Sequence, residues 1–389
     1  MEKKEQPTHS LQIYKCCLQT LYICPMSKSL LFIPDISGFT NFVQTTEVEH
    51  SQHVIAELLE VLISANTQDL KLAEVEGDAL FFYKENAVPS KEKLLAQIET
   101  MYTAFYSHLK MMETNRICPC NACASAPKLQ LKIILHTGEL QFLTVQGNRK
   151  PFGEPVIQAH RLLKNKVESE NYALISSELA EEIGLTIDYD SQLYHFREGL
   201  DTYDGVDVSY LYSEISSSSL KLNNFAMPLV VNPTMPPDFT KTFHFKVSAY
   251  EVYEIITNYR HRHKWVKGVD EFIFNENEVS RVGTEHVCII NGKHFNFTTV
   301  IKEVPVHQLI YGELTFSPPP LEKMYHFFVL DPIRENECLL TVELFWETKT
   351  VWQKFLMLIG GKKQLTTAFS ESIDNLHKLM HQNTPEPVL

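Results

Sequence analysis

Two aspartates, each close to a glycine, are the residues in this sequence best suited to phosphate chemistry. Asp35 lies in the segment 32–40 (FIPDISGFT), after an apolar run and before a glycine turn, and Asp78 follows Gly77 in another turn. Carboxylate oxygens bind Mg²⁺, and backbone N–H groups at the start of a helix receive phosphate oxygens. On neighbouring strands, the two carboxylates would form a two-metal clamp that activates a hydroxyl and stabilises a leaving pyrophosphate. Alternatively, each aspartate is a turn or capping residue.

A cysteine loop is the other group of residues able to do chemistry. Cys118, Cys120 and Cys123 lie within six residues, in the sequence CPCNAC. Three thiolates at this spacing can converge on one Zn²⁺ or on part of an iron–sulfur cluster. A structural zinc site normally has four ligands; the candidates for the fourth are His108, His136 and Cys288, and the sequence selects none of them. Alternatively, the loop holds free thiols or a redox-labile disulfide.

The elements that must position these residues can be read from the apolar spacing. Apolar runs predict strands at 30–34, 70–76, 79–83, 129–136 and 140–145. Helical spacing predicts helices around 55–62, at 91–114 and at 155–165. The order strand, helix, strand, strand, helix, strand is the βαββαβ plan of a ferredoxin-like palm. We therefore expect an α+β fold with Asp35 at the end of a strand and Asp78 in a tight hairpin.

A second unit is expected after a serine-rich linker. Four serines at 216–219 mark the linker, and the pattern beyond it predicts a strand at 238–247, a short helix at 249–259, a series of strands between 271 and 346 and a long final helix. We expect domains at 28–214 and 237–382, joined by a linker at 215–236, with a tail at 383–389. Residues 1–27 are expected to be disordered or to precede the true start, because Met26 is a natural beginning.

Composition limits the function classes. The chain has 389 residues, enough for two domains at roughly 100–200 residues each. Its 35 basic and 48 acidic residues give a net charge of −13, which argues against a nucleic-acid polymer or an anionic membrane surface as partner. Apolar runs of about 18 residues, the length that spans a membrane, are absent from the sequence. We expect a cytoplasmic protein.

The order of the motifs resembles the class III adenylate and guanylate cyclases. In that family Asp-x-x-Gly-Phe-Thr follows the first strand, Gly-Asp lies in the next hairpin, a later strand ends in His-Thr-Gly, and Gly-Asp/Glu precedes a helix with Asn and Arg. The matching segments here are Asp35–Thr40, Gly77-Asp78, His136–Gly138, and Gly153-Glu154 followed by Arg161. The resemblance covers residues 30–213 and implies the ferredoxin-like cyclase palm.

The resemblance also implies roles for single residues. Asp35 and Asp78 would bind Mg²⁺ or Mn²⁺ with help from the Ile36 carbonyl, and Arg161 would offset charge on the transferring phosphoryl group. The implied nucleotide-binding residues are Gly38, Phe39, Thr40, Glu74 and Lys150. Cyclases of this class work as dimers with the active site at the interface, so the resemblance implies a homodimer that binds a purine nucleotide.

The pattern departs from the family at the residues that would hold the base and the ribose. Ile157 stands where the family has Asn, four residues before Arg161, and isoleucine cannot hydrogen-bond a ribose. Glu74 matches the base-reading Glu of guanylyl cyclases, but Lys150 opposite it is unusual, and the two could pair with each other. The metal-binding residues of the family pattern are complete, whereas the residues for the base and the ribose are altered. This combination favours nucleotide or metal binding over catalysis.

The C-terminal half resembles START-like (SRPBCC) helix-grip proteins. Residues 245–253 resemble the opening of that fold, and residues 262–265 (RHKW) resemble its tryptophan-containing turn. The resemblance covers residues 237–382 and implies a curved sheet around the last helix, enclosing a cavity for an apolar small molecule. Candidates for the cavity wall are Phe295, Phe297, Tyr311, Tyr325, Phe327, Phe328 and Trp346, although core packing is the simpler role for each.

Three functional hypotheses follow. The favoured one is a cyclase-like signalling protein that binds a purine nucleotide with a divalent metal, is degenerate in catalysis, and is coupled to a START-like domain with an apolar ligand. The alternative is an active homodimeric cyclase that converts ATP or GTP to the 3′,5′-cyclic nucleotide. The third is a carrier of an apolar ligand whose cyclase-like half serves dimerisation.

Overall fold

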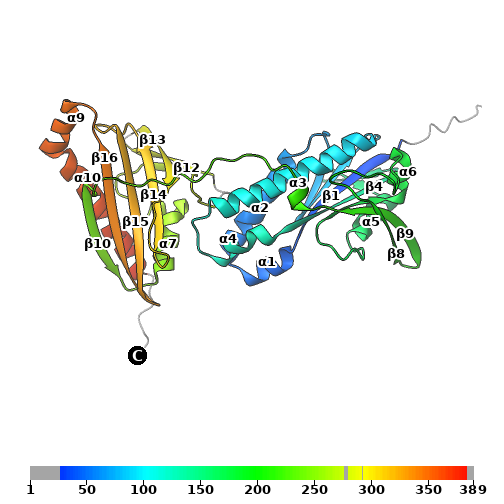
Figure 1. Ribbon diagram of the computed structural model, residues 1–389, viewed down its shortest axis with the longest axis horizontal. Helices are drawn as coiled ribbons and strands as arrows, with labels where there is room; N and C mark the ends of the chain where they lie inside the picture. Colours follow the sequence, from blue (N-terminus) through cyan, green and yellow to red (C-terminus); the bar gives the residue numbers. More distant parts are fainter. Residues whose placement is uncertain (1–26, 276–278, 291, 383–389) are drawn as a thin grey trace, which may run out of the picture.

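The structure is a computed structural model that describes residues 27–275, 279–290 and 292–382. It has two seven-stranded sheets, one in each half of the chain, and a small two-stranded sheet. Figure 1 shows the two large sheets at opposite ends of an elongated molecule, each with its own helices. The expected α+β class is confirmed. The predictions for the start of the chain (1–26) and for the tail (383–389) fall outside the described residues.

The N-terminal sheet has the strand order β2-β3-β1-β4-β7-β9-β8. Its strands are β1 (Ser29–Ser37), β2 (Lys71–Glu76), β3 (Ala79–Lys84), β4 (Gln130–Gly138), β7 (Tyr172–Ser176), β8 (Arg197–Tyr203) and β9 (Val206–Glu214). Strands β4 and β7 pair in parallel, and the other neighbours pair antiparallel. The order β2-β3-β1-β4 is that of the split βαββαβ plan expected from the sequence. The strands β7, β9 and β8 extend it.

Helices cover both faces of this sheet. They are α1 (Phe39–Thr45), α2 (Val48–Ser64), α3 (Lys91–Thr114), α4 (Asn121–Ser125), α5 (Glu154–Leu162) and α6 (Ser177–Ile183), and β5 (Gln141–Val145) and β6 (Asn148–Phe152) form the small hairpin. Successive residues of a strand face opposite sides. Leu30 and Phe32 therefore share a core with α2 and α3, whereas Leu31 and Ile33 share one with α5.

Several element boundaries differ from the sequence prediction, among them those of β1 and α5. Strand β1 continues to Ser37, so Asp35 lies inside it rather than at its end. The strand continues because it is paired on both sides there, with Lys132 of β4 and Ala79 of β3 opposite Asp35. The helix expected at 155–165 is α5, which begins at Glu154 and ends at Leu162.

The serine-rich segment between the two halves is partly folded. Ser217–Ser219 form a short 3₁₀ turn, and Leu220 after it is buried in the N-terminal core. Farther on, Val230 pairs with Ile301 of the C-terminal half. The connection therefore packs against both halves of the molecule.

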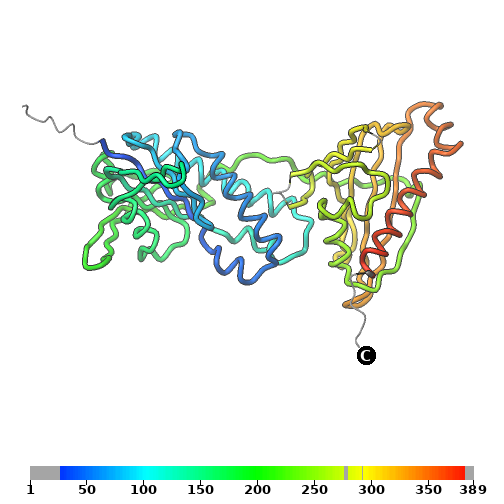
Figure 2. Tube along the Cα trace, turned by 180° about the vertical axis from the view of Figure 1, so that it is seen from behind, coloured from blue at the N-terminus to red at the C-terminus, as the bar shows by residue number. Residues whose placement is uncertain are grey.

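The C-terminal sheet is antiparallel, with the order β10-β16-β15-β14-β13-β12-β11. Its strands are β10 (Phe239–Phe245), β11 (Glu271–Ile273), β12 (Glu285–Ile290), β13 (Lys293–Val300), β14 (Leu309–Phe316), β15 (Lys323–Arg334) and β16 (Glu337–Glu347). The helices are α7 (Ala249–Thr257), α8 (Tyr259–Arg262), α9 (Val351–Leu356) and α10 (Lys362–Gln382). Residues of α7 and α10 share one core with the sheet, and Figure 2 shows α10, in red, lying along it.

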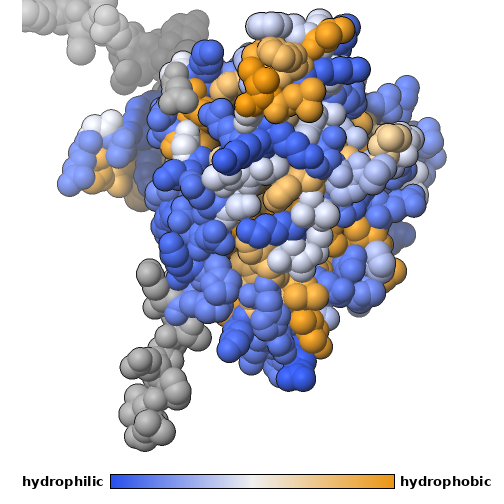
Figure 3. All heavy atoms as spheres, turned by 90° about the vertical axis from the view of Figure 1, so that its left-hand side faces the viewer, coloured by the Kyte–Doolittle hydropathy of each residue, from blue (hydrophilic) through white to orange (hydrophobic). Residues whose placement is uncertain are grey.

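Helix α9 leaves apolar side chains uncovered. Val351, Trp352 and Phe355 of α9 are exposed, and so are Leu358 and Ile359 of the π-helical turn Met357–Gly361 that follows it. The helical path is interrupted at Gly360 before α10 begins. In Figure 3, which views this end of the molecule, hydrophobic atoms gather at the top, where α9 lies. Within residues 27–275, 279–290 and 292–382, each helix is too short or too polar to span a lipid bilayer.

Candidate functional site

The structure places Asp35 and Asp78 side by side. Asp35 lies opposite Ala79 in the β1–β3 ladder, and the Ile36 N–H donates a 3.1 Å hydrogen bond to the Asp78 carbonyl oxygen. Burial and the negative charge of Asp35 raise the pKa of Asp78 to about 6. Two carboxylates so close together disfavour each other's charge unless a cation lies between them.

A lysine that the sequence analysis missed already supplies one positive charge. Lys132 of β4 lies opposite Asp35, with its Nζ 3.1 Å from Asp35 Oδ2. Its signal in the sequence is a lone basic residue within the otherwise apolar run 131–135. Two carboxylates and one ammonium leave a net charge of −1. The carboxylate oxygens still suit a hard divalent cation, and this charge favours one such ion over two.

The glycine turn after Asp35 has the expected form. Gly38 has φ 87°, a left-handed conformation that favours glycine, and it leads directly into α1. Phe39 is half-buried against the N-terminal core, and Thr40 is exposed. The turn thus presents its backbone beside Asp35.

The residues implied for the base and the phosphoryl group are paired with other side chains. Lys150 Nζ lies 2.7 Å from Glu74 Oε2, so these two side chains bind each other. Arg161 pairs with Asp204 of the β8–β9 turn. Ile157 projects from α5 and is 54% exposed. For Glu74 to bind a base, its ion pair with Lys150 would have to break. For Arg161 to bind a phosphoryl group, its ion pair with Asp204 would have to break.

The His-Thr-Gly segment has structural partners. His136 Nδ1 lies 2.8 Å from the Ser176 hydroxyl, and the Thr137 hydroxyl donates to the Ser29 carbonyl oxygen. A Cβ at Gly138 would lie 2.4 Å from Cγ of Pro155, so only glycine lets α5 approach β4 this closely. Burial lowers the pKa of His136 to about 4, which keeps it neutral.

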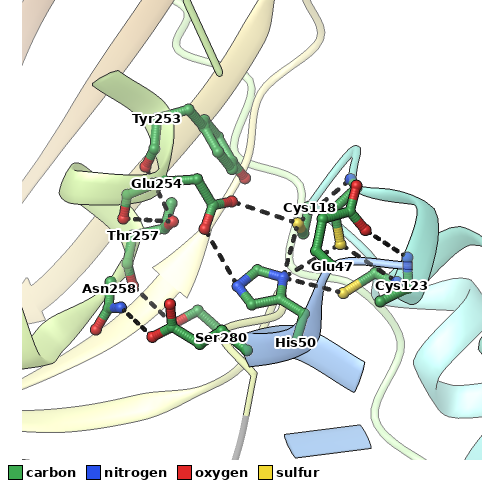
Figure 4. A network of polar contacts seen from close by, with 12 residues as sticks. Glu47, His50, Cys118, Cys123, Tyr253, Glu254, Thr257, Asn258 and Ser280 are labelled. Atoms are coloured by element: carbon green, nitrogen blue, oxygen red, sulfur yellow. Dashed lines mark hydrogen bonds and ion pairs between the residues drawn. The ribbon is translucent and has the colours of Figure 1, made fainter. Parts of the chain in front are cut away.

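The three cysteines of the loop converge, and the fourth side chain among them is His50. The thiols of Cys118, Cys120 and Cys123 and the ring of His50 offer ligand atoms that all lie within 4.8 Å of one another. His50 Nδ1 lies 3.2 Å from Cys120 Sγ, 3.4 Å from Cys118 Sγ and 3.7 Å from Cys123 Sγ. Figure 4 shows the histidine ring between the sulfurs and Glu254 of α7.

None of the three histidine and cysteine candidates from the sequence joins this cluster. His108 of α3 pairs with Glu57 at 2.7 Å, His136 lies on β4 against Ser176, and Cys288 lines a cavity of the C-terminal half. His50 lies 68 residues before the first cysteine of the loop. Packing of α2 against α4 brings His50 to the cysteines. The spacing of residues along the sequence does not predict this contact.

The cluster has strongly shifted acidities. Hydrogen bonds from Cys118 and Cys123 lower the pKa of Cys120, whereas the contacts with Cys120 and Cys123 raise the pKa of Cys118. Burial by itself lowers the pKa of His50, but its contacts with Cys120, Cys123 and Glu254 outweigh burial and raise this pKa to about 12.

A cavity of about 680 Å³ lies in the C-terminal half, between the sheet and α10. Apolar side chains dominate its wall, including Trp265, Phe272, Cys288, Phe297, Phe328 and Phe369. Lys363 and Gly360, next to the exposed face of α9, also line it. Its volume is within the range of small-molecule pockets.

A buried charged group forms the polar part of this cavity. Glu313, 3% exposed, accepts hydrogen bonds from Arg262 at 2.6 Å and from the Tyr311 hydroxyl at 2.7 Å, and its Oε2 lies 3.2 Å from His326 Nε2. Burial alone would raise the pKa of Glu313, but the positive charge of Arg262 holds this pKa well below its usual range. Glu313 and Arg262 are thus a buried, satisfied ion pair.

Strand alternation corrects part of the expected cavity wall. Phe297 and Phe328 line the cavity as expected. Tyr325 and Phe327 do not: Met324, His326 and Phe328 of β15 point inward, so Tyr325 and Phe327 pack on the other face with Phe345. Phe295 and Trp346 pack beside the cavity residues, and Tyr311 serves the polar group.

Comparisons with known proteins match parts of the chain. A family model described as "Protein of unknown function (DUF2652)" matches residues 55–172, a segment that contains Asp78 and the cysteine loop but not Asp35 or His50. An uncharacterized protein of Mycobacterium tuberculosis is 31% identical over 127 residues. That alignment covers 33% of this chain and 59% of the relative, so the chain spans less than two thirds of the relative's length.

Solved structures resemble parts of the chain. The catalytic core of a rhodopsin-guanylyl cyclase with converted specificity is 14% identical and covers 49% of this chain and 97% of its own, with a TM-score of 0.37. A norcoclaurine synthase from Thalictrum flavum is 11% identical and covers 37% of this chain and 93% of its own, with a TM-score of 0.30. At TM-scores this low, the chain's own residues remain the basis for its function.

Proposed function

We propose that this protein is a cyclase-like signalling protein that binds an apolar small molecule in its C-terminal half and a purine nucleotide with a divalent cation in its N-terminal half. The observation that carries the proposal is the cavity of about 680 Å³ with an apolar wall and a few convergent polar groups. The START-like resemblance of this half predicts the same kind of ligand.

Two buried polar atoms of the cavity residues specify how the ligand would be held. Trp265 Nε1 and His326 Nδ1 are buried and have no hydrogen-bond partner among the described residues. An unpaired buried polar group costs about 1–3 kcal/mol, so such atoms usually have a partner. Both side chains line the cavity, so a ligand with an apolar body and a polar group near Trp265 and His326 would satisfy these nitrogens once either ring turns toward it.

Binding of a fluorescent apolar probe, such as a naphthylamine, to the full-length protein tests the cavity. Ala368 of α10 lines the cavity, and Ala368→Trp would fill part of it. We expect this variant to lose at least ten-fold in probe affinity, whereas Asp374→Trp, on an exposed position of the same helix, should bind like the wild type. Equal probe binding by all three proteins would contradict the cavity proposal.

For the N-terminal half, the neighbouring carboxylates of Asp35 and Asp78 support a nucleotide with one Mg²⁺ or Mn²⁺. Their oxygens and the Ile36 carbonyl would hold the ion, and the Gly38–Thr40 turn would face the phosphates. The cation would neutralise phosphate charge and position the nucleotide. The ammonium of Lys132 holds Asp35 in place and contributes one positive charge.

Calorimetric titration with GTP or ATP and Mn²⁺ tests this site, with an assay for cyclic product in parallel. We expect binding by the wild type, loss of binding in Asp35→Asn, and no change in Asp188→Asn, an exposed control. No binding of either nucleotide would contradict the proposal and leave the carrier hypothesis. Formation of cyclic product would support the alternative of an active cyclase.

The residues implied for the base, the ribose and the phosphoryl group are paired or replaced, whereas both metal-binding carboxylates are present, so we favour binding over catalysis. Glu74 binds Lys150, Arg161 binds Asp204, and Ile157 cannot replace the expected asparagine. We also propose a homodimer. Exposed apolar side chains on β6 and α5, namely Phe152 and Ile157, would form its contact surface, because α5 lies next to β6.

A further inference from the structure

We propose that His50, Cys118, Cys120 and Cys123 form a closed structural zinc site, and that this site fastens the C-terminal half to the N-terminal half through Glu254. Three thiolates and one imidazole are a common ligand set for structural zinc. The four ligands come from three places in the chain: the first turn of α2, the loop after α3, and α4. The site is independent of the Asp35–Asp78 pair.

The distances among the ligand atoms fit a tetrahedral ion. With Zn–S bonds of about 2.3 Å and a Zn–N bond of about 2.0 Å, a tetrahedron places the nitrogen about 3.5 Å from each sulfur. The observed distances from His50 Nδ1 to the three sulfurs are 3.2, 3.4 and 3.7 Å. One ring nitrogen therefore faces all three sulfurs at the separation that a shared ion requires.

The surroundings support the thiolate form of the ligands. The Cys120 N–H donates to Cys118 Sγ at 3.5 Å, and the Cys123 N–H donates to Cys120 Sγ at 3.3 Å. Glu47, the residue before α2, accepts hydrogen bonds from the N–H groups of Asn121 and Ala122. The start of α2 thus fixes both the histidine and the cysteine loop. All three cysteines are buried, at 2–7% exposure.

The alternatives for this loop fit less well. All three cysteines are free thiols, whereas a disulfide requires sulfurs about 2 Å apart. An iron–sulfur cluster usually takes four thiolates around several irons. Here a histidine takes the fourth place, and all ligand atoms lie within 4.8 Å of one another. This arrangement encloses one ion.

Glu254 connects the site to the other half of the molecule. Its Oε2 lies 3.3 Å from His50 Nε2, and its Oε1 lies 3.8 Å from Cys118 Sγ (Figure 4). Metal-binding histidines usually donate their second ring N–H to a carboxylate, which orients the ring and strengthens the ligand. Here the carboxylate belongs to α7 of the C-terminal half. Zinc would hold His50 as the Nε2–H tautomer that donates to Glu254, so metal binding and docking of α7 would support each other.

Metal analysis of the purified full-length protein tests the site. After incubation with zinc and removal of the excess, we expect one zinc per chain in the wild type and in Cys288→Ser, a buried cysteine outside the cluster. Cys120→Ser and His50→Ala should retain less than a tenth, and His50→Cys should keep the metal because it supplies a fourth thiolate. Circular dichroism establishes that each variant is folded. Wild type without zinc, or His50→Ala with a full equivalent, would overturn the site, and so would iron in place of zinc.

The role of Glu254 needs a separate test. We expect Glu254→Gln to weaken zinc binding by at least ten-fold, measured by competition with a chromogenic chelator. Glu49→Gln is the matched control, because Glu49 contacts Asn258 of the same junction at 2.9 Å without touching the cysteines. Removing zinc should also speed amide hydrogen exchange in residues 249–257 of the wild type. Unchanged affinity in Glu254→Gln, or equal weakening in both variants, would overturn the coupling.

Discussion

At the scale of single residues, charge compensation decides what each candidate site can do. Lys132 neutralises one of the two carboxylates at Asp35 and Asp78, and Arg262 neutralises Glu313 in the C-terminal cavity. The two sites differ in the negative charge that remains after this pairing. Glu313 is fully compensated by its partners, whereas Asp78 keeps a raised pKa because burial and Asp35 oppose its charge. An uncompensated carboxylate is the one available for a cation.

The variant Asp78→Asn should be more stable than the wild type above pH 6. The folded state holds the Asp78 proton more tightly than the unfolded chain does, so the wild type loses stability as the pH rises from about 4 through about 6. We expect a gain of about 1 kcal/mol at pH 8, after allowing for solvent screening, and no gain at pH 4. Urea unfolding at both pH values measures this. Asp188→Asn should show no such difference, and an equal gain at both pH values would contradict the explanation.

At the scale of elements, helix α2 organises the centre of the molecule. Its apolar face, with Val54, Leu58 and Leu62, is buried in the N-terminal core. Its first turn carries His50 toward the cysteines. Two turns later, Glu57 accepts two hydrogen bonds from Arg281 of the C-terminal half, at 2.7 and 2.8 Å. One amphipathic helix therefore supplies core packing, the histidine of the proposed zinc site and a junction contact.

Removing Arg281 should destabilise this junction strongly. Arg281→Ala leaves Glu57, 12% exposed, without its main counter-charge, and we expect a loss of about 3 kcal/mol in the free energy of unfolding. The double variant Glu57→Leu/Arg281→Met removes both charges and should recover most of this loss. Guanidinium unfolding of the three proteins provides the comparison. A double variant as unstable as Arg281→Ala would show that packing of the arginine, and not its charge, matters.

At the scale of the whole molecule, the proposed homodimer would use the apolar surface around β6. Phe152 of β6 and Ile157 of α5 are exposed on elements that lie next to one another. Contiguous exposed apolar patches commonly mark protein–protein contacts. In the cyclase-like proposal, this surface also adjoins Glu74 and Lys150, so a second chain would cover those residues.

The variant Ile157→Asp should weaken the dimer at least ten-fold, because it places a charge in an apolar contact. Sedimentation equilibrium of the full-length protein measures the dissociation constant. Ile187→Asp, at an exposed apolar position outside this surface, is the control and should dimerise like the wild type. A wild type that sediments as a single chain at all concentrations would contradict the dimer.

The sequence by itself determined what depends on local pattern. Apolar periodicity predicted α3 at 91–114 and the β2–β3 hairpin around Gly77 and Asp78, because side-chain spacing and turn residues act over a few positions. The same spacing identified the cysteine loop. The split βαββαβ order followed from the succession of these elements.

Only the tertiary structure decided which distant side chains meet. His50 reaches the cysteines because α2 packs on α4, and Lys132 faces Asp35 because β4 pairs with β1. Tyr325 and Phe327 turned away from the cavity because register, not aromatic character, sets which face a strand residue occupies. Such contacts depend on packing between segments far apart in sequence. Local pattern carries no information about them, and they complete each candidate site.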